Sequence, residues 1–149
     1  MARIEASVMI NRPIDKVFAY VTDARSWPKW ESGLLEAEQT SKGPVGVGTR
    51  FRGTNQVLGL RMEWTSEVME YEPNRKWGQR ITSGSWSTEE SLTFQPVEDS
   101  TTLALVSVLE LRGFFRLVAP ILVRMMQKQI EANLASLKGI LEGQTDSST

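Results

Sequence analysis

The chain has 149 residues, of which 40% are hydrophobic and 23% charged, which fits one globular domain and leaves too little sequence for a second core. Seventeen basic and eighteen acidic residues give a formal net charge of −1, so no overall charge attracts the chain to nucleic acid or to an anionic membrane. Cysteine and histidine are absent, which excludes disulfides, Cys/His zinc sites and nucleophiles activated by histidine.

The N-terminus and the longest apolar stretch bear on targeting. The N-terminus starts directly with an alternating pattern and has neither the apolar core nor the cleavage site of a signal peptide. The longest apolar stretch, residues 114–126, is interrupted by Arg116, Pro120 and Arg124 and falls short of the roughly 20 residues that span a bilayer. We therefore expect a cytoplasmic protein without integral membrane association.

The first elements are a strand and two short helices. Residues 3–10 alternate between apolar and polar side chains, which predicts a half-buried strand. Asn11 and Pro13 then predict a helix start, with Asn11 as the N-cap and an end near residues 22–23. Residues 23–30 predict a second helical turn whose two tryptophans face one way.

Six further runs have strand character and follow one another at hairpin spacing. They are residues 34–40, 49–57, 60–71, 76–82, 85–95 and 101–111. The breaks between them are short and rich in Gly, Pro, Asn and Asp, and no helical segment intervenes. We therefore expect one antiparallel meander.

The last element is a long helix over residues 113–142, apolar nearly all round in its first half and amphipathic in its second. Burial on several sides requires a wrapping partner, and a curved sheet is the only candidate. Pro120 predicts a kink or break near residues 117–120. We expect residues 1–142 to form a single domain and residues 143–149 to be a disordered tail.

This order of elements resembles the helix-grip fold of the START and birch-pollen-allergen superfamily, also called SRPBCC. Five local phrases, in the right order along nearly the whole chain, are similar to its polyketide cyclase/dehydrase-like branch. They are residues 11–18, the segment 23–30 with its Asp and two Trp, the glycine turn 46–51, the strand end 70–73 and the helix end 137–142.

The resemblance implies an α+β fold with a curved six- to seven-stranded antiparallel sheet wrapped around the long C-terminal helix. It also implies a cavity between sheet and helix that holds a small apolar or amphipathic molecule, such as a lipid. The alternative is a dry core filled by the same side chains. From strand alternation and helical spacing, we predict a cavity lined by Met62, Trp64, Ser66, Trp77, Gln79, Trp86, Thr88, Glu90, Phe94, Phe115, Val118, Leu122, Met125, Met126 and Gln129.

Glu90 is the sharpest candidate for chemistry. A carboxyl group on the same strand face as Thr88 and Leu92 would bind a ligand hydroxyl or act as a general base with a raised pKa. A shift of one residue at the Glu89–Glu90 pair would instead place Glu90 in water. Arg80 alternates to the outer face.

Other sites are not indicated. The Gly46-x-Gly48 turn is followed by a strand and lacks the strand–turn–helix context of a phosphate-binding loop. The carboxylates form no ligand-like cluster, so we predict no metal and no cofactor. Nucleic acid is not an expected partner.

Three functions remain open. The first is a carrier or sensor for a small hydrophobic or amphipathic ligand. The second is a cyclase/dehydratase-like enzyme that acts on an aromatic or polyketide-type substrate, with Glu90 as its acid or base. Because the chain has no histidine and few acid/base candidates, the non-enzymatic role is favoured. The third is a protein-interaction module with residues 117–126 as its contact surface. A homodimer also remains open.

Overall fold

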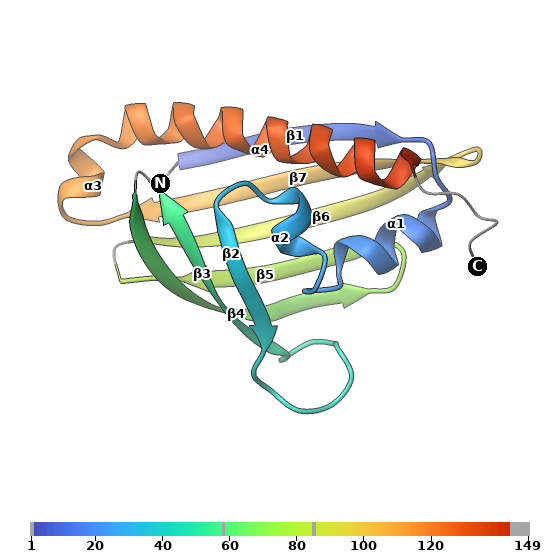
Figure 1. The fold of residues 1–149 in the computed structure, drawn as a ribbon, viewed down its shortest axis with the longest axis horizontal. Coiled ribbons are helices and arrows are strands. Elements are labelled where there is room, and N and C mark those ends of the chain that lie inside the picture. Colours follow the sequence, from blue (N-terminus) through green and yellow to red (C-terminus); the bar gives the residue numbers. More distant parts are fainter. Residues whose placement is uncertain (1, 58, 85, 144–149) are drawn as a thin grey trace.

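A seven-stranded antiparallel sheet curves along one side of a long C-terminal helix (Figure 1). The computed structural model describes residues 2–57, 59–84 and 86–143. The strand order is β1-β7-β6-β5-β4-β3-β2, so the predicted meander runs from β2 to β7 and the N-terminal strand β1 pairs with β7. The predicted helix-grip α+β fold is confirmed.

The elements agree closely with the sequence patterns. Each predicted strand is present with ends shifted by no more than two residues. The strands are β1 (Ala2–Ile10), β2 (Leu34–Gln39), β3 (Arg50–Val57), β4 (Leu60–Glu72), β5 (Lys76–Thr82), β6 (Trp86–Val97) and β7 (Ser100–Leu111). The helices are α1 (Ile14–Val21), α2 (Trp27–Trp30), α3 (Phe114–Leu117) and α4 (Ala119–Gly143).

The start of α1 differs from the prediction, because Asn11 is not its N-cap. Pro13 occupies that position with extended backbone and no side-chain cap. The Asn11 side chain accepts a hydrogen bond from the Ser100 hydroxyl at 2.9 Å, and its backbone N–H donates to Glu142 Oε2 at 2.8 Å. Asn11 therefore ties the end of β1 to β7 and to the last turn of α4.

The C-terminal helix is broken where Pro120 predicted it. Val118, at φ −104° and ψ 16°, separates α3 from α4. The expectation that the first half is buried on several sides is wrong, because Leu117 is 80% exposed and Ile121 is 64% exposed. The sheet instead covers the second half of α4, where Leu134, Leu137 and Leu141 are buried. Gly143 ends α4, and the remainder of the expected tail lies outside the described residues.

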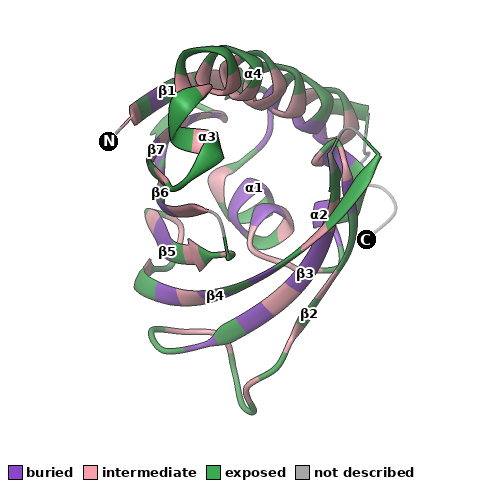
Figure 2. Cartoon of the chain, turned by 90° about the vertical axis from the view of Figure 1, so that its left-hand side faces the viewer, coloured by how far each residue is buried: buried purple, intermediate pink, exposed green. Residues whose placement is uncertain are grey.

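An aromatic cluster fills part of the space inside the sheet. The ring of Trp77, which is 1% exposed, lies 6.1 Å from those of Phe51 and Tyr71 and 6.2 Å from that of Trp27. Figure 2 shows the sheet curving round much of a ring, with α4 along its upper side and α1 within its outline. No helix in the described part of the chain combines the length and apolar character needed to cross a bilayer.

Candidate functional site

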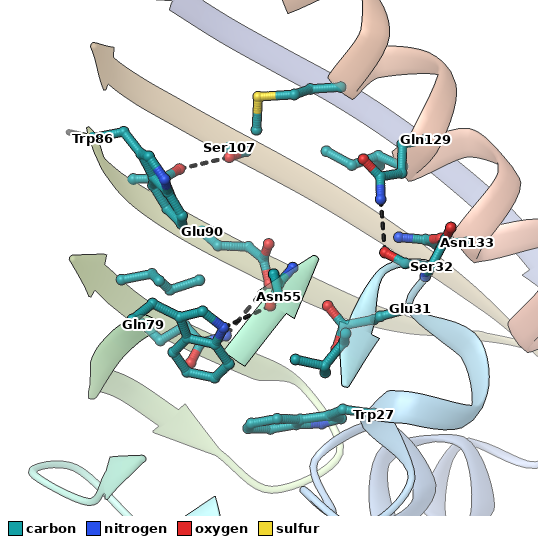
Figure 3. A pocket seen from close by; sticks show the side chains of 16 residues that line it. Trp27, Glu31, Ser32, Asn55, Gln79, Trp86, Glu90, Ser107, Gln129 and Asn133 are labelled. Carbon is teal, nitrogen blue, oxygen red and sulfur yellow. Dashed lines mark hydrogen bonds between the residues drawn. The ribbon is translucent and has the colours of Figure 1, made fainter. Parts of the chain in front are cut away.

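A cavity of about 140 Å³ lies between the inner face of the sheet and α4 (Figure 3). Every strand except β1 contributes to its wall, together with α2, the turn after α2, and α4. Its lining residues are Trp27, Glu31, Ser32, Leu34, Asn55, Trp64, Gln79, Ile81, Trp86, Thr88, Glu90, Ser107, Met126, Gln129, Ile130 and Asn133.

Of the residues predicted to line the cavity, about half lie on its wall. These are Trp64, Gln79, Trp86, Thr88, Glu90, Met126 and Gln129. The structure places the others elsewhere, and they are Met62, Ser66, Trp77, Phe94, Phe115, Val118, Leu122 and Met125.

The predicted residues off the wall fall into two main groups. Trp77 and Phe94 pack in the core, where the ring of Phe94 lies 5.0 Å from that of Phe18. Phe115 lies on α3, Val118 lies between α3 and α4, and Leu122 and Met125 lie on the first turns of α4, where Met125 is 43% exposed. The helical repeat identifies a face of α4, but it does not specify how far along the axis the sheet extends. Met62 is half-buried, and Ser66 is buried away from the cavity.

The register of β6 directs Glu90 inward. Thr88, Leu92 and Phe94 on the same face are buried. Glu89 points to the outer surface, where it pairs with Arg80 at 3.1 Å. The Glu90 carboxyl accepts a long hydrogen bond of 3.5 Å from the Gln79 side-chain amide.

A second carboxyl group, that of Glu31, faces the same cavity and was not predicted. Glu31 caps the C-terminus of α2, and its backbone N–H donates to the Trp27 carbonyl at 2.9 Å. This position lies between a four-residue helix and a strand, where neither the helical nor the strand repeat specifies which way a side chain points. No pattern in the sequence marks it.

Helix α4 holds the backbone beside Glu31. The Gln129 amide donates to the Ser32 carbonyl at 2.7 Å, and the Ser32 N–H donates to Asn133 Oδ1 at 2.9 Å. Both polar backbone groups of Ser32 are therefore satisfied by side chains one turn apart on α4. Gly33 follows at φ +84°, a conformation that favours glycine.

The two carboxyl groups have unusual proton affinities. Burial, and secondarily the charge of Glu90, raise the pKa of Glu31 to about 8. Burial also raises the pKa of Glu90, and the hydrogen bond from Gln79 opposes this rise. Removing a carboxylate from water disfavours its charged form, and a second negative charge nearby adds to the effect. Near neutral pH, Glu31 is therefore mostly protonated.

Trp64 depends on a glycine for its position. A Cβ atom added at Gly53 would lie only 2.2 Å from Trp64 Cζ2, so the indole lies directly over this glycine. Its N–H donates to Asn55 Oδ1 at 2.7 Å. The small residue on β3 thus makes room for a large ring on the cavity wall.

Three buried polar side chains on the sheet line the cavity, those of Gln79, Thr88 and Ser107. Gln79 is 9% exposed, and its Oε1 atom is buried with no hydrogen-bond partner among the described residues. The Thr88 and Ser107 hydroxyls hydrogen-bond to each other at 2.7 Å. Ser107 was missed, although it interrupts the inward apolar row of Leu103, Leu105 and Leu109. A polar residue in such a row is a detectable signal.

The chemistry open to this wall is hydrogen bonding and proton transfer. One carboxyl group that is protonated near neutral pH and a second with a raised pKa can accept, donate or exchange a proton. Within residues 2–57, 59–84 and 86–143, no three acidic side chains lie close enough together to hold a metal ion.

Solved structures from several bacteria share this fold. TTHA0849 from Thermus thermophilus is 20% identical, with a TM-score of 0.80 over 93% of this chain and 95% of that chain. A START superfamily protein from Mycobacterium smegmatis is 16% identical, with a TM-score of 0.80 over 96% and 99%. The Zhui aromatase/cyclase from Streptomyces sp. R1128 is 18% identical, with a TM-score of 0.79 over 95% and 93%.

A comparison with curated protein sequences gives no match. The family model described as polyketide cyclase / dehydrase and lipid transport matches residues 1–142. The resemblance drawn from the five sequence phrases is thereby confirmed. The chain belongs to the polyketide cyclase / dehydrase and lipid transport family.

Proposed function

We propose that this protein binds a small amphipathic ligand in the cavity between the sheet and α4, as a carrier or sensor. The observation that carries the proposal is the cavity wall, which combines three tryptophans with the side-chain amide of Gln79 and the carboxyl groups of Glu31 and Glu90. Gln79 Oε1 is itself buried and has no hydrogen-bond partner among the described residues, and such an acceptor costs about 1–3 kcal/mol. A turn of the amide toward the cavity would let a ligand donor offset that cost.

The size and the wall of the cavity limit the ligand. A cavity of about 140 Å³ matches the apolar cavities of roughly 150 Å³ that accept one benzene ring. Trp27, Trp64 and Trp86 supply flat apolar surface, and the two glutamates supply polar groups. We therefore propose one ring-sized apolar part inside the cavity, with any larger part of the ligand leaving through its mouth.

An enzyme is the second candidate. Glu31 and Glu90 face one cavity with raised pKa values, which suits general acid/base chemistry. In this reading the substrate is an aromatic or polyketide-type molecule, and the reaction is cyclisation or dehydration. A turnover assay with Glu31→Gln and Glu90→Gln variants separates this candidate from a carrier, because both variants would lose turnover.

Binding is tested with benzyl alcohol, a neutral probe with one ring. The five indole N–H signals in an NMR titration provide the readout. We expect those of Trp27, Trp64 and Trp86 to shift, and those of Trp30 and Trp77, which do not line the cavity, to stay in place.

An Ile81→Trp variant fills the cavity, and an Ile81→Leu variant conserves its volume. The first should abolish the shifts and the second should retain them. If wild-type protein shows no shift at the three wall tryptophans, or if Ile81→Trp responds like wild type, the proposed function is wrong.

We also infer that residues 1–142 form a single functional domain and that the protein acts in the cytoplasm. Fractionation of the protein's own cells tests the location, and recovery of the protein with the membrane fraction after a high-salt wash would contradict it.

A further inference from the structure

We infer that the cavity selects a ligand with an organic ammonium group, a protonated or quaternary amine attached to a ring-sized apolar body. This inference rests on the proposed function, because it names the chemical class of the ligand that the same cavity holds.

The charge of the wall is the first argument. Glu31 and Glu90 are its acidic residues, and no Lys or Arg of the described chain lines the cavity. A ligand carboxylate or phosphate would lose its hydration with no cation to balance it. A ligand cation would instead favour the ionised forms of the two glutamates, against the effect of burial, and replace its lost hydration with charge-assisted hydrogen bonds to them.

The aromatic residues on the wall are the second argument. Trp27, Trp64 and Trp86 come from α2, β4 and β6, so three separate elements bring indole rings to one small space. Figure 3 labels Trp27 and Trp86. The face of an indole ring attracts a cation more strongly than the ring of Tyr or Phe does, and the attraction increases when water is excluded. Three tryptophans beside two carboxyl groups therefore suit an ammonium group.

The balance of donors and acceptors is the third argument. The Trp27 and Trp64 N–H groups donate to Val21 O and Asn55 Oδ1, both at 2.7 Å. The Gln129 amide donates to the backbone of Ser32. By contrast, Gln79 Oε1 is buried without a donor among the described residues. Gln79 Oε1 and the ionised forms of Glu31 and Glu90 are acceptors, and an ammonium group supplies N–H donors to them.

Three probes of one ring and different charge test the inference. They are benzylamine, benzyl alcohol and benzoate, which are cationic, neutral and anionic near pH 8, where the pKa of Glu31 lies. We expect benzylamine to bind about tenfold or more tightly than benzyl alcohol, and benzoate to bind more weakly than both. Isothermal titration gives the three dissociation constants.

Matched variants locate the effect. Glu31→Gln and Glu90→Gln should each reduce the preference for benzylamine over benzyl alcohol by about tenfold, while the affinity for benzyl alcohol changes little. Glu89→Gln, whose side chain points outward to Arg80, should leave the preference unchanged.

The outcomes separate this inference from the proposed function. If benzyl alcohol or benzoate binds as tightly as benzylamine, the ammonium class is wrong and cavity binding survives. If none of the three probes binds, both are wrong. If the preference for benzylamine persists in Glu31→Gln and Glu90→Gln, the carboxyl groups do not provide it and the inference fails.

A second, independent observation concerns the outer side of α3 and the start of α4. Between residues 111 and 130 the sequence has four basic residues and no acidic one, in a chain with a net charge of −1. Exposed apolar side chains lie in the same stretch. We call this surface the basic apolar face, and it consists of Arg112, Phe114, Arg116, Leu117, Ile121, Arg124, Met125 and Lys128.

We propose that the basic apolar face docks on a bilayer that carries anionic lipids. On α4, Ile121, Arg124, Met125 and Lys128 follow the spacing i, i+3, i+4, i+7, so they share one side of the helix, and all four are exposed. Apolar and basic side chains on one exposed helix side suit the boundary between headgroups and acyl chains, where the apolar groups insert and the cations pair with phosphates.

Cosedimentation with vesicles tests the docking. We expect binding to phosphatidylcholine vesicles that contain phosphatidylglycerol, but not to phosphatidylcholine alone, and loss of binding in high salt. Ile121→Ser and the pair Arg124→Gln/Lys128→Gln should each weaken binding several-fold. The pair Arg61→Gln/Arg75→Gln, exposed on β4 and in the turn before β5, should not. Equal binding to both kinds of vesicle, or none, overturns the proposal. A stable dimer that Ile121→Ser dissociates would assign this face to a second copy of the chain.

Discussion

The carboxyl groups of Glu31 and Glu90 face one small cavity from different elements, and the charge of Glu90 raises the pKa of Glu31. Glu31 is positioned by the end of α2, and Glu90 is positioned by the register of β6. Two carboxyl groups 59 positions apart in the sequence thus influence each other's protonation. Because only the folded chain buries them side by side, their protonation is linked to folding.

The raised pKa of Glu31 makes stability depend on pH. In the unfolded chain this carboxyl loses its proton near the ordinary value of 4.5, whereas in the folded chain it keeps the proton up to about 8. Between these values the folded state binds more protons than the unfolded state. The free energy of unfolding should therefore fall as the pH rises through this interval and level off above it. Urea denaturation at several pH values measures the fall.

The Glu31→Gln variant should show a smaller fall over the same interval, because the side chain no longer ionises. The free energy of unfolding of this variant should still depend on pH to some extent, because burial also raises the pKa of Glu90. Glu89→Gln serves as the control and should follow wild type, since its side chain is exposed. If the free energy of unfolding falls equally in Glu31→Gln and in wild type, Glu31 is not the group responsible for the pH dependence.

Removing the charge of Glu90 should lower the pKa of Glu31. In a Glu90→Gln variant the pKa of Glu31 should move from about 8 toward 4.5 without reaching it, because burial is the larger cause of the shift. An NMR titration of the side-chain carboxyl carbon reports this pKa directly. An unchanged pKa would show that the two carboxyl groups do not interact.

The contact between α4 and the turn after α2 should hold Glu31 in place. An Asn133→Ala variant leaves the Ser32 N–H without its partner and should cost about 0.5–1.5 kcal/mol. Hydrogen exchange at the Ser32 amide should become faster. Lys128→Ala on the exposed side of α4 is the control. If the Ser32 amide also exchanges faster in this variant, the cause is a general loosening of the helix and not the loss of one hydrogen bond.

Gly53 should be intolerant of any side chain. In a Gly53→Ala variant the added Cβ would overlap the Trp64 ring, so the ring must leave its place above β3 and its hydrogen bond to Asn55. We expect a loss of about 1–3 kcal/mol and an altered Trp64 indole N–H signal in the NMR spectrum. Gly46→Ala meets no atom within 4 Å and should be close to neutral. Equal stability of the two variants would refute the contact.

The strands were predictable because a two-residue repeat reports both the element and the buried face. Alternation along β6 placed Thr88 and Glu90 on the inner face, and β5 was predicted with the bounds that it has, Lys76–Thr82. Pro120 marked the break between α3 and α4 for an equally local reason, since proline lacks the N–H that continues a helix.

The cavity itself was less predictable, because its wall depends on where elements end. Glu31 lies at the junction of α2 and β2, which no repeat describes. Phe115 and Leu122 have helical spacing toward the sheet, yet they lie beyond the part of α4 that lines the cavity. Trp77 has the right strand parity but packs into the aromatic cluster instead. Side-chain parity can be read from the sequence, whereas the position of an empty space cannot.

Native mass spectrometry of the protein purified from its own cells, followed by organic extraction, tests most directly whether the cavity holds a ligand. We predict that wild type and Ile81→Leu carry a bound small molecule with an apolar ring and that Ile81→Trp, with its cavity filled, carries none. The same bound mass on Ile81→Trp would contradict ligand binding in this cavity. So would wild-type protein that carries no bound molecule, even after incubation with an excess of an organic extract of the same cells.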